Sequence, residues 1–109
     1  MYDLEKINSI IDDINRFFSD LNNIGLNEKN LDVPEKLHGS SMLILGIMNR
    51  SIDLAGEILV KNDIPMPSSY NKCFSPLSKE GLLDKNITLE MERLIGKRGL
   101  FAHHYVEKS

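Results

Sequence analysis

The chain has 109 residues, of which 41% are apolar and 27% charged, and its formal net charge is −3. This length and composition predict one globular domain over residues 1–109, and the apolar runs are too short to span a membrane. The single cysteine, Cys73, excludes an internal disulfide. The N-terminal segment lacks the pattern of a signal peptide, which predicts a cytoplasmic protein. The negative net charge disfavours a surface that binds nucleic acid constitutively.

Residues 3–24 are predicted to form an amphipathic helix that ends at Gly25. Their apolar residues recur at alternating spacings of three and four, which is typical of a helix packed along one side. Glycine is a common stop signal for a helix. Three heptads with a widened stripe favour a bundle helix over a coiled coil. The stripe consists of Leu4, Ile7, Ile11, Ile14, Phe18 and Leu21, widened by Ile10, Phe17 and Ile24.

A second helix is predicted from about residue 35 to residue 62. Pro34 fits its first turn, where no amide donor is needed. The helix is apolar on two sides, and both sides must be covered. The domain's own core covers one side, and either further helices or a second copy of the protein cover the other. One face carries Leu37, Ile44, Met48, Ile52, Ala55 and Leu59, and the other carries Leu43, Ile47, Leu54 and Ile58.

Residues 64–67 contain two prolines and predict a break in the helical structure. A short helix is expected to begin near Tyr70, with Ser68 or Ser69 as its N-cap. Pro76 is expected to kink or end this helix, because proline has no amide hydrogen and clashes with the preceding turn. The residues of this segment expected to be buried are Phe74, Leu77 and Leu82.

The last helix is expected to begin at residues 86–88 and to lead directly into Arg98. No segment of the chain shows the sustained alternation of apolar and polar residues that predicts a strand. The predicted fold is therefore all-α, an up-down bundle of four to five helices. The inner stripe expected for the last helix consists of Ile87, Met91, Leu94 and Ile95.

Residues 98–105 hold an unusual concentration of reactive side chains: Arg98, His103, His104 and Tyr105. An imidazole can take or give a proton near neutral pH, and a guanidinium can stabilise charge that develops on phosphate oxygens. This combination indicates acid–base cleavage of RNA without a metal ion. The alternative interpretation is structural: an arginine that complements a helix dipole, solvated histidines and a tyrosine at the edge of the core.

Ideal helical geometry limits how these groups can meet. Each residue turns by about 100°, so Arg98 and Tyr105 share a face whereas His103 lies about 140° from Arg98. Arg98 and His103 therefore converge on one ligand only if the helix loosens or if a second protomer contributes to the site. Gly99 makes such loosening credible, because glycine weakens a helix by up to about 1 kcal/mol relative to alanine.

The spacing Arg-x4-His-x-Tyr resembles the motif of the HepT-like toxins, a branch of the HEPN superfamily. The segment 49–59 is similar to the central helix of that family, with an aspartate followed by an apolar-Ala pair. The segments 67–74 and 77–83 resemble its Pro-x-Ser-Tyr-x-x-x-Phe-x-x-Leu region, and Gly96 precedes the motif as it does in the family. The likeness extends in the correct order over most of residues 1–107.

This resemblance implies an all-α, HEPN-like homodimer with the motif near the dimer interface. It implies a metal-independent endoribonuclease, the toxin of a toxin–antitoxin system, with Arg98 and His103 as the catalytic pair. It also implies a nucleotidyltransferase antitoxin that uses ATP to transfer AMP units onto Tyr105 and so neutralises the toxin, which itself needs no cofactor. His104 is an auxiliary candidate, at a position where the family varies.

Three residues depart from the pattern of the family. Gly99 stands where the family usually has a polar residue, often asparagine, and Leu100 stands where a basic residue is frequent. Pro76 falls inside a segment that is normally an uninterrupted helix. These departures leave open a catalytically silent helical dimer that binds a nucleotidyltransferase partner or a nucleotide. A third reading is a purely structural four-helix dimer with solvated histidines.

Overall fold

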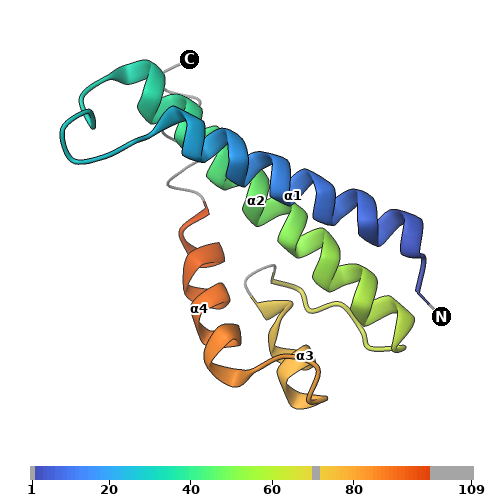
Figure 1. Cartoon of the computed structure of the whole chain (residues 1–109). Coiled ribbons are helices and arrows are strands. Elements are labelled where there is room, and N and C mark those ends of the chain that lie inside the picture. Colours follow the sequence, from blue (N-terminus) through green and yellow to red (C-terminus); the bar gives the residue numbers. More distant parts are fainter. Residues whose placement is uncertain (1, 70–71, 99–109) are drawn as a thin grey trace.

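The computed structural model describes residues 2–69 and 72–98 of the chain. Within these ranges the chain forms four helices and no strand, so the all-α prediction is confirmed. None of the helices found there is long and apolar enough to cross a membrane. The helices are α1 (Leu4–Ile24), α2 (Pro34–Lys61), α3 (Ser75–Lys79) and α4 (Lys85–Gly96), as Figure 1 shows.

The central element of the fold is α2, the longest helix. The first helix, α1, runs antiparallel beside it, and the two together form a long helical hairpin (Figure 1). The shorter helices α3 and α4 lie on the other side of α2. Helices of the same chain therefore lie on two sides of α2.

The ends of α1 and α2 follow from local chemistry. Asp3 caps the start of α1, because its carboxylate accepts a hydrogen bond from the backbone amide of Lys6 at 3.1 Å. Gly25 ends the helix in the left-handed conformation at φ 67°, which glycine adopts without steric cost. Pro34 lies in the first turn of α2, as predicted. The predicted bounds of both helices are confirmed to within one residue.

The prediction for Pro76 is wrong. This proline neither kinks nor ends a helix but lies in the first turn of α3, which begins at Ser75. In the first turn the missing amide hydrogen has no partner to lose, so proline is tolerated there. Helix α4 begins at Lys85, one residue before the predicted range, because the carboxylate of Asp84 accepts hydrogen bonds from the amides of Asn86 and Ile87.

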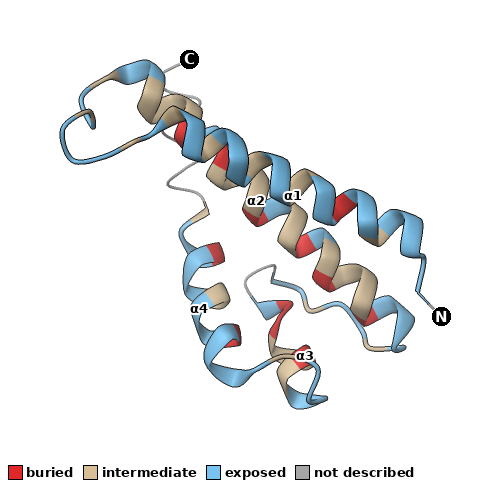
Figure 2. Cartoon of the chain, in the orientation of Figure 1, coloured by how far each residue is buried: buried red, intermediate tan, exposed pale blue. Residues whose placement is uncertain are grey.

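The hydrophobic core lies between α2 and the segment that contains α3 and α4. Figure 2 shows buried positions along α2 facing those on the shorter helices. The predicted face of α2 is confirmed for four residues, and Phe74, Leu77 and Ile95 are buried as predicted. The buried cluster consists of Met48, Ile52, Ala55 and Leu59 from α2, Cys73, Phe74 and Leu77 in and before α3, and Ile95 from α4.

The contact between α1 and α2 depends on small residues in α2. A Cβ atom added at Gly46 would lie 3.0 Å from the ring of Phe17, and one added at Gly39 would lie 3.1 Å from the Ile24 side chain. These glycines therefore let the two helix backbones approach closely. Ile10 is buried in this contact at 1% exposure.

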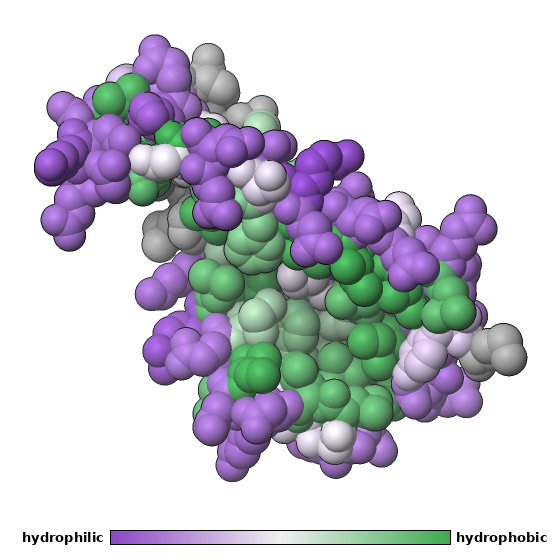
Figure 3. Space-filling model, viewed as in Figure 1, coloured by the Kyte–Doolittle hydropathy of each residue, from purple (hydrophilic) through white to green (hydrophobic). Residues whose placement is uncertain are grey.

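Several residues predicted to be buried are exposed instead. On α1 these are Leu4, Ile11 and Phe18, which lie at one edge of a stripe that is wider than its contact with α2. On α4 the buried residues are Thr88 and Ile95, one heptad apart, and the predicted stripe is wrong at Ile87 and Leu94. Leu82 is exposed as well. Figure 3 shows that apolar surface gathers between α1 and the α3–α4 segment and is bordered by hydrophilic residues.

Candidate functional site

Arg98 follows the end of α4. The helix stops at Gly96, and the amide of its C-cap residue Lys97 donates a hydrogen bond to the carbonyl of Leu94 at 3.0 Å. The prediction that this helix leads directly into Arg98 is confirmed except for one residue: Lys97 is a turn at φ −94° and ψ 5°, and Arg98 is helical again.

The side chain of Arg98 is held against α2. Its Nη1 donates a hydrogen bond to Oδ1 of Asn49 at 2.9 Å, across 49 residues of sequence. Asn49 is exposed and Arg98 is half-buried. Asn49 follows Met48, which is buried at 1% exposure in the core, so its position is fixed by the packed part of α2. The guanidinium thus meets solvent beside a rigid helix.

The residue after Asn49 makes a different set of contacts. Arg50 donates to Asp13 of α1 at 2.9 Å and to Asp53 of its own helix at 2.8 Å. Asp13 also accepts from Arg16 at 3.1 Å. Two carboxylates on one guanidinium compensate its charge and tie α1 to α2, so Arg50 has a structural role.

A groove along the N-terminal half of α1 and the C-terminal half of α2 also holds charged side chains. Its cations are paired within the groove: Lys6 lies 3.0 Å from Glu57, and Arg50 binds Asp53. Such a surface has no excess of positive charge to attract a phosphate. Within residues 2–69 and 72–98, no group of three or more histidine, cysteine or acidic side chains is placed to hold a metal ion.

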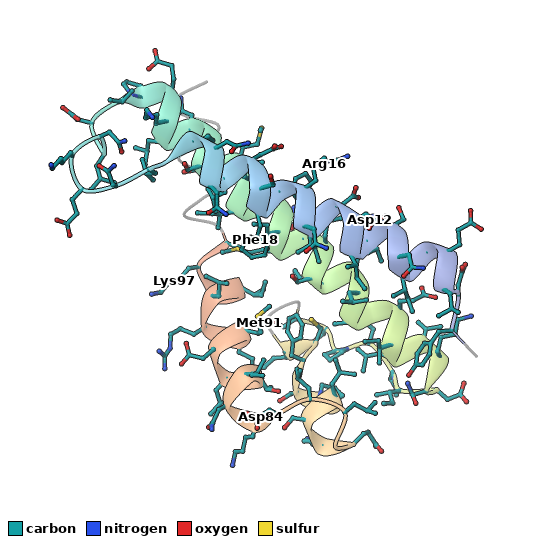
Figure 4. All side chains as sticks on the ribbon, in the orientation of Figure 1. Asp12, Arg16, Phe18, Asp84, Met91 and Lys97 are labelled. Carbon is teal, nitrogen blue, oxygen red and sulfur yellow. The ribbon has the colours of Figure 1, made fainter. Side chains whose placement is uncertain are left out.

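Figure 4 shows how the two sides of α1 differ. Asp12 and Arg16 lie on the side that faces away from α4, whereas Phe18 lies on the side toward α4. Lys97 lies at the end of α4 nearest to Phe18 in this view. The side of α1 that carries Asp12 and Arg16 is therefore turned away from the region where α4 leads into Arg98.

Cys73 is a core residue and not a nucleophile. Its thiol is fully buried, and burial raises its pKa from 9.0 to about 11; a backbone hydrogen bond opposes this rise, and the charge of Glu92 adds a still smaller upward contribution. Because the thiolate is the reactive form, a thiol with this pKa is unreactive near neutral pH.

Of the predicted site residues, Arg98 is the one within the described part of the chain. His103, His104 and Tyr105 lie outside the described residues, as does Gly99. The residue that the sequence did not identify is Asn49, which was noted only as part of a segment that resembles the central helix of a family. No local pattern indicates its contact with Arg98, because the contact joins two distant helices.

Comparison with known proteins gives one match. A family model described as ribonuclease HepT-like matches residues 6–107, which is nearly the whole chain. No curated protein and no solved structure matches the chain. The family match agrees with the resemblance in the C-terminal motif, and the helical fold fits the HEPN superfamily.

Proposed function

The chain belongs to the HepT-like ribonuclease family, and on this premise we propose that it is a metal-independent endoribonuclease toxin that uses Arg98 and His103. The observation that carries the proposal is the position of Arg98, held by Asn49 at 2.9 Å on an exposed part of α2. A guanidinium fixed on a rigid helix is a preorganised site for a phosphate, because little reorganisation is needed when the charge develops.

The proposed chemistry is transesterification of the RNA backbone. The 2′-hydroxyl of a ribose attacks the adjacent phosphorus, the neutral imidazole of His103 takes the hydroxyl proton, and the bond to the 5′-oxygen breaks. An imidazolium, from the same residue or from His103 of a second copy, protonates the leaving oxygen. Arg98 stabilises the negative charge on the non-bridging oxygens. The products are a 2′,3′-cyclic phosphate and a 5′-hydroxyl, and no cofactor is consumed.

We further propose that the active form is a homodimer. The apolar surface between α1 and the α3–α4 segment in Figure 3 supports a partner on this side, as does the exposed side chain of Phe18, which lies on the side of α1 toward α4 in Figure 4. A second copy would bring a second imidazole to a site that has few groups per protomer. Phe18→Glu is expected to shift the protein toward monomers in analytical ultracentrifugation, whereas Asp12→Asn on the opposite side of α1 leaves the association unchanged.

The same site suits inhibition by modification. In the proposed system a nucleotidyltransferase antitoxin binds the toxin, the Tyr105 oxygen attacks the α-phosphorus of ATP, and pyrophosphate leaves. The AMP ester that forms adds negative charge seven residues from Arg98. This charge repels RNA and competes with it for the guanidinium.

The test is cleavage of a defined RNA by the purified full chain in the presence of EDTA. The wild type is expected to leave 2′,3′-cyclic phosphate ends with a bell-shaped pH dependence. Arg98→Ala and His103→Ala are each expected to lower the rate on the order of 100-fold or more. The control is Arg93→Ala, since Arg93 is exposed on α4 and lies 3.6 Å from Glu90; this variant keeps the wild-type rate.

Two outcomes contradict this function. Equal cleavage by the wild type and by His103→Ala would remove the proposed acid–base pair. Intact RNA at high concentrations of the wild type, together with tight binding of a nucleotidyltransferase or a nucleotide, would favour the catalytically silent dimer. That alternative is motivated by Gly99, which replaces the polar residue usual in the family.

A further inference from the structure

We propose that Asn49 is a phosphate-binding residue of the RNA site, which it forms together with Arg98. The inference deepens the proposed function and rests on it. It begins with the hydrogen bond between Arg98 Nη1 and Asn49 Oδ1 at 2.9 Å, which joins the end of the α4 segment to the middle of α2.

The direction of this hydrogen bond fixes the orientation of the Asn49 amide. A guanidinium has five N–H donors and no acceptor, so the amide must present its oxygen to Arg98. The amide nitrogen, with two further donors, then lies beside the guanidinium. Within the described residues Nδ2 of Asn49 donates to no protein group, and the residue is exposed. A neutral donor is therefore available next to a cation on the surface.

Asn49 differs from the acceptors of Arg50 because its side chain carries no charge. The carboxylates of Asp13 and Asp53 lie 2.9 and 2.8 Å from Arg50 and compensate its charge. An amide oxygen is neutral, so Asn49 orients the guanidinium without adding a negative charge that would repel a phosphate. Asparagine at position 49 thus combines positioning of the cation with a donor for a phosphate oxygen.

Asn49 also supplies a polar group that position 99 lacks, where this chain has glycine and the family usually has a polar residue. Glycine has no side chain to contribute a donor next to Arg98 in the sequence. Asn49 supplies an amide next to Arg98 in space, from a different helix. The replacement of a polar residue by Gly99 therefore does not by itself remove polar donors from the site.

The experiment measures binding of a fluorescein-labelled, fully 2′-O-methylated RNA oligonucleotide to the full chain by fluorescence anisotropy. This probe has no free 2′-hydroxyl and cannot be cleaved by the proposed route, so binding is measured apart from catalysis. Asn49→Ala is expected to weaken binding roughly three- to tenfold, the loss typical of one hydrogen bond. The double variant with Arg98→Ala is expected to bind no more weakly than Arg98→Ala alone, because the two residues act as a unit.

Asn49→Asp separates phosphate binding from a purely structural tie. A carboxylate would hold Arg98 at least as firmly as the amide does. The free energy of unfolding measured in urea is therefore expected to be at least as large in Asn49→Asp as in Asn49→Ala. The carboxylate would also place a negative charge beside Arg98 that repels a phosphate, so binding is expected to fall roughly tenfold below that of Asn49→Ala. A structural tie predicts the reverse order of affinities. The charge-matched control is Asn86→Asp in the first turn of α4, about 15 Å along that helix from its end, which keeps wild-type binding.

Three results would overturn the inference: wild-type affinity in Asn49→Ala, affinity of Asn49→Asp equal to or above that of Asn49→Ala, or binding that does not depend on Arg98. Its failure is distinguishable from failure of the proposed function. A wild type that binds the probe through Asn49 and Arg98 but leaves unmodified RNA intact contradicts the ribonuclease alone. A wild type that cuts RNA as fast as Asn49→Ala does, with equal affinity for the probe, contradicts the role of Asn49 alone.

Discussion

The two sides of α2 are held by different physical means. Toward α1, the helices meet at Gly46 and Gly39 and are tied by ion pairs at the rim, among them Arg50 with Asp13. Toward α3 and α4, the contact is a buried apolar cluster that includes Leu59. The comparison indicates that the α1 side stabilises the hairpin, whereas the packing on the α4 side also determines where the segment leading to Arg98 lies.

The largest effect is expected from the apolar core on the α4 side. Leu59 is 0% exposed, and Leu59→Ala is expected to lower the free energy of unfolding by about 2–5 kcal/mol through lost burial and a residual cavity. Urea unfolding measures this loss. Val60→Ala is the control, because the neighbouring Val60 is 65% exposed and its truncation costs little. Similar losses in the two variants would contradict the core as described.

A second prediction concerns the buried thiol on the same side. The pKa of Cys73 is raised from 9.0 to about 11, so its contribution to stability is complete below pH 9.0 and is lost as the pH rises toward 11. Between pH 8 and pH 10.5, wild-type stability is expected to fall by about 2 kcal/mol more than that of Cys73→Ala. Urea unfolding of both proteins at the two pH values measures this difference. The wild type and Cys73→Ala share the same tyrosines and lysines, so the titration of those residues drops out of the comparison. Parallel losses would show that the thiol is not buried.

The close approach of α1 to α2 is tested by two glycines of α2. Alanine is favoured over glycine in a helix by up to about 1 kcal/mol at both positions. A Cβ at Gly46 meets the ring of Phe17 at 3.0 Å, whereas one at Gly56 meets Met66 at an ordinary 3.6 Å. Gly46→Ala is therefore expected to be less stable than Gly56→Ala by about 1–2 kcal/mol, the cost of overpacking. Equal free energies of unfolding in Gly46→Ala and Gly56→Ala would mean that Phe17 of α1 does not pack closely against Gly46.

The smallest effect is expected at the charged rim of the α1 side. Asp13→Asn removes ion pairs to Arg16 and Arg50 and is expected to cost about 1 kcal/mol at low salt, less at high salt. Asp12→Asn on the same helix is the control and is expected to change stability by less than about 0.5 kcal/mol. Neither variant is expected to alter RNA cleavage. A large loss of activity in Asp13→Asn would place the α1 side within the functional site.

The parts of this fold that were predictable from the sequence are those set by local chemistry. Gly25 and Pro34 mark helix ends through backbone conformation and the missing amide donor, and both were predicted correctly. The burial of single residues in α1 and α4 was less predictable. An apolar stripe shows that a helix packs but not which edge of the stripe meets its neighbour, so Phe18 and Leu94 were assigned to the interior although they are exposed.

The candidate site could be predicted only in part for a related reason. The residue types at Arg98 and beyond indicate phosphate chemistry wherever they lie, because charge and proton transfer belong to the side chains themselves. The hydrogen bond from Arg98 to Asn49 is a tertiary contact with a residue 49 positions earlier, and no periodicity encodes it. The turn at Lys97 between α4 and Arg98 was not predicted, because no proline marks it in the sequence.

The most direct test of the comparison is a crystal structure of the full chain bound to a 2′-O-methylated RNA oligonucleotide. The account predicts a phosphate oxygen within hydrogen-bond distance of Arg98, with the amide nitrogen of Asn49 on the same phosphate. A phosphate bound instead in the groove of Lys6 and Arg50, with Arg98 remote from the RNA, would contradict the assignment of function to the α4 side of α2.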